Sequence, residues 1–369
     1  MTSRPTVLVL RCLGLGDFVT GVPALRAVRD AFPDHRILLA TRPHLAPLVS
    51  LADAVDAIAP SRPLTHLGSD CLHPDVAVNL HGRGPQSHRV LLATRPGRLL
   101  AFAHRDVPEC ATGPEWVRDE HEIDRWCRML TECGVPADER RTDLCRPDVP
   151  PPAAAIGATI VHPGASRPSR RWPVERFAAV ARRERAAGRS VVVTGSVDER
   201  ALAHRLAELA ELPTGAVLAG SLDLADLAAA VAVAGRVVSG DTGVAHLATA
   251  YRVPSVVLFG PVPPSRWGPP TDRPWHRALW AGRTGDPHAM EPHPGLLDLS
   301  VDDVLQALDE LDHLDDVRAR GADDPLLRRA HRFVMGTGAS SPTAAPSGEG
   351  PPRRPAAPPT VPAAPRGAR

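Results

Sequence analysis

The chain has 369 residues, of which 43% are hydrophobic, and its formal net charge is +1. This length fits two ordinary domains better than one, and the near-neutral charge gives no global field that would attract nucleic acid. All 43 basic residues are arginine, so any cationic contact to a phosphate must come from a guanidinium. The six cysteines include no Cys-x-x-Cys pair, which predicts reduced thiols and a cytoplasmic protein.

The start of the chain predicts neither a signal peptide nor a membrane segment. Arg11 interrupts the short apolar run at residues 7–10, whereas a signal peptide needs a longer apolar region. No apolar stretch approaches the roughly 20 residues of a membrane helix.

The first half predicts strands that alternate with helices. Apolar, β-branched runs predict strands at residues 6–11, 37–40, 75–80 and 98–102. Helices are expected at residues 19–31 and 119–133, with another between the third and fourth strands. A Pro- and Ala-rich stretch at residues 146–155 predicts a linker.

The second half repeats the alternation. Strands are expected at residues 159–162, 190–194, 216–219, 237–238 and 255–259. Helices are expected after Pro173, at 198–210, from Ser221 or Asp223 to 234, and at 244–251. A capping box at 300–303 predicts a last helix that ends at 311. Strand–helix alternation predicts the α/β class, with a Rossmann-like, doubly wound parallel sheet in each half. We therefore expect domains at 1–150 and 151–335, and a disordered Pro/Ala-rich tail at 336–369.

Asp17 follows the first strand in the loop Gly14-Leu-Gly16-Asp17. The third glycine of a dinucleotide fingerprint is displaced, and no acid ends the second strand at Thr41, so a nicotinamide or flavin dehydrogenase is not expected. Ligands of open α/β sheets bind at the carboxyl ends of the strands, where Asp17 is expected. Two interpretations stay open: a general base for a hydroxyl, or an N-cap of the following helix.

Charged residues also follow two strands of the second half. Ser166 is followed by the pair Arg170-Arg171 before Pro173, and two guanidiniums near a helix N-terminus suit a diphosphate. The alternative is a solvated basic loop. Glu199 presents a similar choice, because it could accept sugar hydroxyls or only stabilise the first turn of its helix.

The segment 239–261 predicts strand, turn, helix and strand. Asp241, Thr242 and Gly243 fall in the turn, and His246 falls in the first turn of the helix. Free N–H groups and the helix dipole favour a phosphate there. A lone histidine or aspartate is more often structural, but their joint occurrence favours a site for an anionic, hydroxyl-rich ligand such as a nucleotide sugar.

Two other clusters carry less information. Residues 286–293 contain metal-type side chains, but their irregular, proline-interrupted spacing does not match a standard site, so no metal is predicted. Asn79, His81 and Arg83 follow a first-domain strand and, with Gly16, are assigned to the acceptor side of the cleft.

Taken in order, these loops resemble glycosyltransferase family 9, the ADP-heptose:lipopolysaccharide heptosyltransferases. The resemblance covers residues 7–308. It rests on Gly14-Leu-Gly16-Asp17 with Pro23-Ala-Leu-Arg26, Pro163-Gly-Ala-Ser166 with Arg170-Arg171-Trp172-Pro173, Asp241-Thr242-Gly243-Val-Ala-His246, Phe259-Gly260-Pro261 and Trp267-Gly268-Pro269. Arginine stands where the family often has lysine, and residues 281–288 stand where many members carry a cysteine-rich stretch.

The resemblance implies a GT-B fold and an inverting, metal-independent transfer without a cofactor. A heptose-type sugar would pass from a nucleotide diphosphate sugar, similar to ADP-heptose, to a glycan or glycolipid hydroxyl, as in lipopolysaccharide core biosynthesis. A lipid-linked acceptor would bring the protein to the inner face of the cell membrane. Asp17 matches the catalytic base, and the donor-binding positions match Ser166, Arg170 or Arg171, Glu199, Asp241, Thr242, Gly243 and His246.

Two other functions fit the same layout. A nucleotide-sugar epimerase of GT-B type would need no acceptor but would need further acid–base groups around the sugar. A non-catalytic module would bind the nucleotide sugar without turnover.

Overall fold

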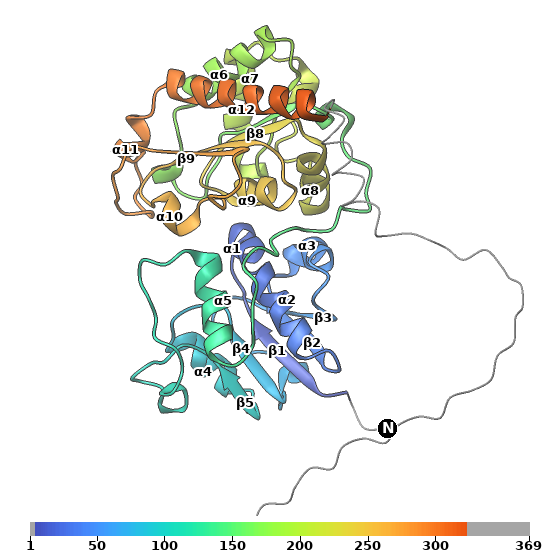
Figure 1. The fold of residues 1–369 in the computed structure, drawn as a ribbon, viewed down its shortest axis with the longest axis vertical. Coiled ribbons are helices and arrows are strands. Elements are labelled where there is room, and N and C mark those ends of the chain that lie inside the picture. Colours follow the sequence, from blue (N-terminus) through green and yellow to red (C-terminus); the bar gives the residue numbers. More distant parts are fainter. Residues whose placement is uncertain (1–3, 323–369) are drawn as a thin grey trace, which may run out of the picture. The chain divides into compact units, whose positions relative to one another are not determined.

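Two parallel five-stranded sheets make up the molecule, each with helices on its faces (Figure 1). The computed structural model describes residues 4–322, and both sheets belong to one unit, Met1–Asp316. The strand orders are β3-β2-β1-β4-β5 and β10-β9-β8-β6-β7. The predicted α/β class with two Rossmann-like sheets is confirmed. The predicted tail at 336–369 lies outside the described residues.

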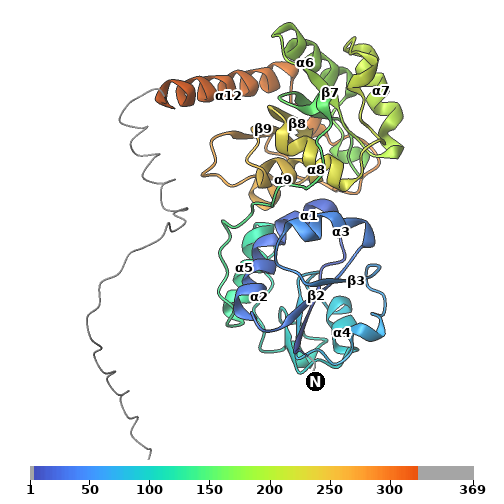
Figure 2. The same cartoon turned by 90° about the vertical axis from the view of Figure 1, so that its right-hand side faces the viewer.

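The first sheet is covered by helices on both faces (Figure 2). Because successive side chains of a strand point to opposite faces, Val7 and Val9 pack in one apolar cluster, whereas Leu8 and Leu10 pack in another. Its elements are β1 (Thr6–Leu10), α1 (Leu15–Thr20), α2 (Val22–Ala31), β2 (Arg36–Thr41), α3 (Ala46–Leu51), β3 (Ala57–Pro60), β4 (Val76–Asn79), α4 (Gln86–Leu92), β5 (Arg98–Leu100) and α5 (Glu122–Glu132).

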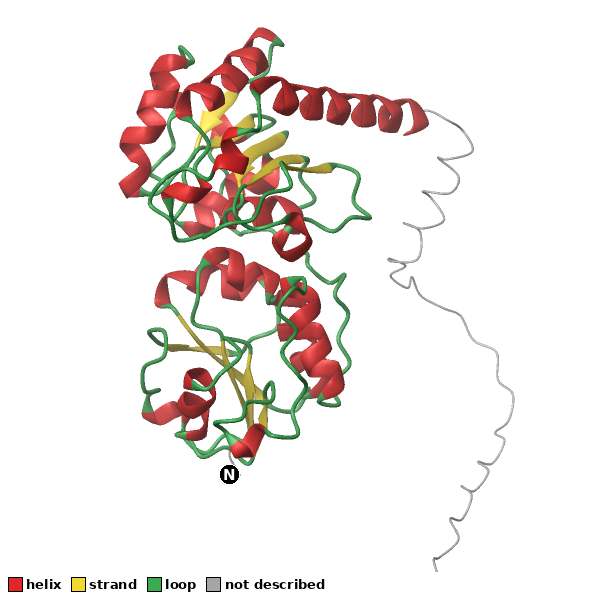
Figure 3. Ribbon diagram, turned by 90° about the vertical axis from the view of Figure 1, so that its left-hand side faces the viewer, coloured by secondary structure: helices red, strands yellow, loops and turns green. Residues whose placement is uncertain are grey.

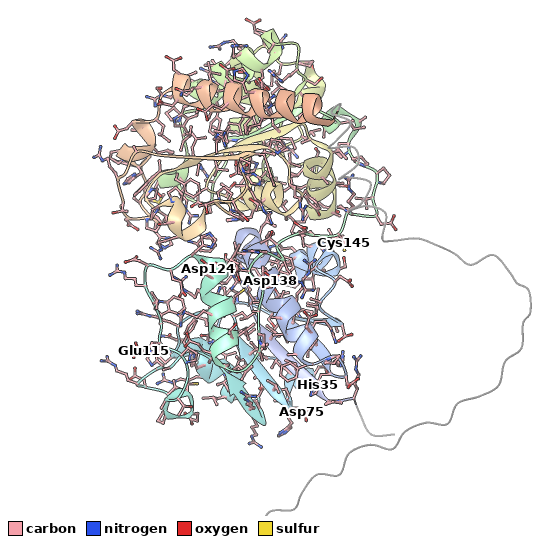
Figure 4. All side chains as sticks on the ribbon, in the orientation of Figure 1. His35, Asp75, Glu115, Asp124, Asp138 and Cys145 are labelled. Atoms are coloured by element: carbon pink, nitrogen blue, oxygen red, sulfur yellow. The ribbon has the colours of Figure 1, made fainter. Side chains whose placement is uncertain are left out.

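Strand β1 lies between β2 and β4, where the strand order reverses. The backbone N–H of Thr6 donates to Oδ2 of Asp75 (2.8 Å), which is labelled in Figure 4, and Val7 pairs with Val76. This register brings the loops that follow β1 and β4 to the same edge of the sheet, the usual position of a ligand crevice.

The second sheet also has helices on both of its faces (Figure 3). Ile160 and Val237 face the cluster that contains α8 and α9, whereas Val161 and Val238 face the one that contains α6 and α7. Its elements are β6 (Thr159–His162), α6 (Val174–Ala186), β7 (Val191–Val193), α7 (Arg200–Leu209), α8 (Leu224–Val233), β8 (Arg236–Gly240), α9 (Gly243–Ala250), β9 (Ser255–Phe259), α10 (Pro264–Trp267), β10 (His276–Trp280), α11 (Pro294–Leu297) and α12 (Val301–Ala322).

The structure corrects several predicted elements. The helix expected at 19–31 is two helices, because α1 already begins at Leu15 and ends at Thr20, and α2 begins at Val22 after the shared cap residue Gly21. In place of the strand expected at 216–219, the structure has the end of a 3-10 turn (Thr214–Ala216) and a single bridge, Val193 to Val217, beyond the edge of the sheet. The elements β3, α3 and β10 were not predicted, since they are short or lack a clear apolar period.

Candidate active site

A cavity of about 1050 Å³ lies at the carboxyl ends of both sheets. One wall comes from the loops after β1 and β2, and the other from the loops after β6, β7, β8 and β9. Concave sites of this kind, at the strand ends of α/β domains, are the usual location of ligands. The predicted site residues in its lining are Gly16, Asp17, Ser166, Arg170, Glu199, Asp241, Thr242, Gly243 and His246.

Asp17 combines features of both interpretations made from the sequence. It is the third residue of α1 rather than its N-cap, which is Gly14, and its Oδ2 accepts a hydrogen bond from the Gly14 N–H (3.1 Å). The half-buried carboxylate also lines the cavity. Its charge reaches the opposite wall, where it adds to the burial that raises the pKa of Asp241 and partly opposes the burial that lowers the pKa of His246.

A buried arginine holds α1 in place. Arg11 is fully buried and donates hydrogen bonds to the carbonyl oxygens of Asp17 and Leu80 and to Oγ1 of Thr20 (3.2 Å). Its Nη2 lies 3.5 Å from Oε1 of Glu122. The sequence reasoning used Arg11 only as an interruption of an apolar run. The available signal was a charged residue directly after a buried strand. A charged group in such a place is buried only when it has partners, so Arg11 could have been predicted to hold neighbouring groups.

The two arginines of the loop after β6 have different surroundings. Arg170 lines the cavity, and its buried Nε has no hydrogen-bond partner among residues 4–322. Arg171 instead donates from Nε (3.0 Å) and Nη2 (2.8 Å) to the carbonyl oxygen of Ala165, and it is not part of the lining. Ser166 lies exposed at the cavity mouth. Of these two arginines, Arg170 is therefore the one whose guanidinium is available to a ligand.

Asp241 and Thr242 form the turn between β8 and α9. Burial raises the pKa of Asp241 to about 6, while Arg170 lowers it and Asp17 raises it further. The Oγ1 of Thr242 is buried and has no partner within the described part of the chain. Helix α9 begins at the next residue, Gly243. Its free N–H groups and an unpaired hydroxyl favour an oxygen-rich anion at this point.

His246 and Gly16 mark a close approach of α9 to α1. A Cβ on Gly16 would lie 2.8 Å from Cδ2 of His246, so glycine is needed there for steric reasons. The ring of His246 also packs edge-on against Trp267, at 5.8 Å between centroids. Burial lowers the pKa of His246 to about 4, and the imidazole is therefore neutral near pH 7.

Glu199 lines the cavity from the loop after β7. Its Oε2 accepts a hydrogen bond from the Ser196 N–H (2.8 Å), and the carboxylate packs against Gly164, where a Cβ would overlap it. Three leucines at the start of α8 continue this wall: Leu222, Leu224 and Leu227. An acid beside an apolar wall offers acceptors for hydroxyls next to a surface for a planar ring.

The residues assigned to the acceptor side lie largely away from the cavity lining. Asn79 is fully buried and donates to Oγ of Ser87 (2.9 Å). Nδ1 of His81 accepts from the Cys12 N–H (3.1 Å), and burial lowers the pKa of His81 to about 4. Arg83 is exposed. Their role stays a prediction. On this side, the loop after β2 contributes lining residues that the sequence reasoning missed: Pro43, His44 and Pro47.

Arg266 and Trp267 on α10 also line the cavity and were missed as site residues. The sequence feature that could have identified them is a basic residue in the loop that follows β9. The other candidates also come from loops that follow strands. Among residues 4–322, no three His, Cys, Asp or Glu side chains gather as metal ligands would. The helices of this part of the chain include none long and apolar enough to span a bilayer.

Comparison with known proteins gives the site its context. The family model described as glycosyltransferase family 9 (heptosyltransferase) matches residues 116–284. Lipooligosaccharide heptosyltransferase 2 of Haemophilus influenzae is 30% identical over 160 residues, which cover 40% of this chain and 45% of that protein. The match thus spans less than half the length of this curated relative.

Two solved structures match nearly all of the described fold. The E. coli ADP-heptose LPS heptosyltransferase II covers 84% of this chain and 99% of its own, with 20% identity and a TM-score of 0.68. The E. coli heptosyltransferase WaaC with ADP-2-deoxy-2-fluoro heptose covers 83% and 99%, with 18% identity and a TM-score of 0.61. These matches confirm the predicted GT-B fold. The chain is thus similar to glycosyltransferase family 9 in sequence over residues 116–284, and to heptosyltransferase structures in fold.

Proposed function

We propose that the protein is an inverting glycosyltransferase. It transfers a sugar, heptose or another, from a nucleotide diphosphate sugar to a hydroxyl of a glycan or glycolipid. The observation that carries this proposal is a single cavity with the Asp17 carboxylate on one wall and Arg170, Thr242 and the N-terminus of α9 on the other. A heptosyltransferase relative and a neighbour that binds an ADP-heptose analogue support an ADP-heptose-like donor.

The donor would lie along the second domain. Leu222 and Leu224 offer an apolar surface to the nucleobase, and Glu199 offers acceptors to the ribose or sugar hydroxyls. The guanidinium of Arg170 and the free N–H groups at the start of α9 bind the diphosphate, because both donate hydrogen bonds and carry positive charge.

Asp17 acts as the general base in this proposal. Its carboxylate takes the proton of the acceptor hydroxyl while the oxygen attacks the anomeric carbon. The bond from that carbon to the diphosphate oxygen breaks, and its electron pair leaves with the diphosphate. Attack from the face opposite the leaving group inverts the configuration. Positive groups already in place for the departing charge usually contribute most to such catalysis.

The proposal includes metal independence, since Arg170 and the α9 amides supply positive charge at the leaving group. Full activity in EDTA is expected, and loss of activity in EDTA with recovery on adding a metal would contradict this part.

The proposal also includes an acceptor that binds near Pro43 and His44, on the Asp17 wall of the cavity. In the same proposal the enzyme acts in the cytoplasm, and a lipid-linked acceptor brings it to the inner face of the membrane.

Asp17→Asn tests the assignment of the base. Asparagine keeps an oxygen that can accept from the Gly14 N–H but cannot take a proton at neutral pH. Transfer should fall by about 10²- to 10⁴-fold, the usual contribution of a general base, with donor affinity within about twofold of the wild type. Full activity of the variant would exclude Asp17 as the base. A sugar isomer formed from donor alone would favour the epimerase.

A further inference from the structure

Among the described residues, the guanidinium of Arg266 has no partner, and it lines the same cavity. It is the third residue of the short helix α10, and it lines the cavity together with Thr242 and Arg170. Its Nε is buried and makes no hydrogen bond within residues 4–322. A buried donor on a charged group is costly unless something accepts from it. The position therefore requires an acceptor that the described residues do not supply.

The next arginines along the chain do not share this property. Arg273 donates to the carbonyl oxygen of Thr249 (3.0 Å), and Arg277 donates from Nε to Glu310 (2.8 Å). Arg283 donates to Oδ2 of Asp298 (2.9 Å). Each guanidinium thus has a protein partner, and Arg266 differs from its neighbours both in lining the cavity and in its unpaired Nε.

Neighbouring contacts fix the place of α10. The ring of Trp267 packs against that of His246 on α9, at 5.8 Å between centroids. The carbonyl oxygen of Gly268 lies 3.0 Å from Nε2 of His121. Arg266 is therefore held beside the N-terminal end of α9, the end where Thr242 has its unpaired hydroxyl.

We propose that Arg266 binds the diphosphate of the donor together with Arg170, so that guanidiniums from two separate loops hold the leaving group. This rests on the proposed function and adds to it a residue that touches the departing phosphates. Arginine suits the task because its planar fork donates two parallel hydrogen bonds to phosphate oxygens. As the sugar–phosphate bond breaks, the charge on the diphosphate grows, and a second cation stabilises it further.

The test measures affinity by calorimetry for three probes that share one base: a nucleoside, its monophosphate and its diphosphate. Adenosine, AMP and ADP are used first, then the guanosine and uridine series. Arg266→Met should weaken diphosphate binding by about 10- to 100-fold, the range expected for a charge-assisted contact, and leave nucleoside binding unchanged. Arg266→Lys should keep part of the lost affinity. Arg283→Met is the matched control, since Arg283 is exposed and lies outside the cavity lining.

The outcomes separate this inference from the proposed function. If the wild type prefers the diphosphate and Arg266→Met keeps the full preference, the inference is overturned and the function stands. If the wild type shows no preference in any series, both are overturned. Should Arg266→Met fail to fold, the ratio of diphosphate affinity to nucleoside affinity is measured for Arg266→Lys and Arg266→Gln instead. An equal loss of affinity for all three probes in Arg266→Met would show that Arg266 has only a structural role, and would contradict the inference.

Discussion

The guanidinium of Arg11 packs so closely over Gly21 that a Cβ on this glycine would lie 2.5 Å from Nε and 2.6 Å from Cδ. Gly21 is also the C-cap of α1 and the N-cap of α2. The absence of a side chain thus leaves room for the arginine that donates to the Asp17 carbonyl.

Gly21→Ala should therefore disturb the base without touching the cavity. The new methyl group must displace Arg11, and overpacking of this kind costs about 1–3 kcal/mol of the free energy of unfolding. Transfer activity should fall as well, since α1 loses its anchor. Urea unfolding and initial rates measure the two effects. Gly68→Ala is the control in the same domain, because a Cβ there meets nothing within 4 Å; equal behaviour of both variants would contradict the argument.

Gly243→Ala should separate Asp17 from the donor wall. A Cβ on Gly243 would lie 2.6 Å from Cδ2 of Leu15, two residues before Asp17. Pushing α1 away from α9 by about 1 Å should lower kcat/KM by about 10²-fold, because transfer depends on the position of the base. Steady-state kinetics give the value, and Gly215→Ala, where a Cβ meets nothing within 4 Å, serves as control. An unchanged kcat/KM would mean that α1 and α9 can move apart without loss of activity, and would contradict this prediction.

Asp241→Asn should stabilise the protein at neutral pH. With its pKa raised to about 6 by burial, the native carboxyl holds its proton at a pH where the unfolded chain, with a pKa near 3.8, has already lost it. The associated stability is present below the unfolded pKa and is lost as pH rises through the folded pKa. The wild type should lose about 2 kcal/mol between pH 4 and pH 7 from this group alone, and the asparagine variant should not.

Chemical unfolding at pH 4, 5, 6 and 7 checks this window. The quantity of interest is the difference in free energy of unfolding between variant and wild type, which should grow as pH rises. Asp272→Asn, which changes an exposed carboxyl, should show the wild-type pH dependence. A constant difference across the range for Asp241→Asn would contradict the raised pKa.

Much of the fold was predictable because long apolar runs and turn residues agree with each other. The strands at residues 159–162 and 255–259 were predicted with their observed bounds. The short strand β3 and the edge strand β10 were not, because edge positions need no continuous apolar pattern. The break at Gly21 had a local signal that was not used, Pro23 in the first turn of α2, whereas no local pattern contains the contact between Arg11 and Gly21.

For the site, the sequence predicted which loops matter more reliably than which side chains. It left Arg170 and Arg171 equivalent, since both precede the same helix. Only the three-dimensional position of the Ala165 carbonyl separates them. Arg266 was overlooked for a related reason: an arginine in a loop says nothing about whether its guanidinium has a partner, and here the missing partner is the informative fact.

A cavity whose cations are all guanidiniums has a charge that does not titrate. Arginine stays protonated at every pH where the protein is folded, so Arg170 and Arg266 present a constant positive potential to the nucleotide. A change in nucleotide affinity with pH then reports the ionisation of the ligand's terminal phosphate, with a pKa of about 6, and that of Asp241. Ionisation of that phosphate, which the product gains on release from the sugar, should tighten its binding as pH rises, whereas ionisation of Asp241 over the same range should oppose it.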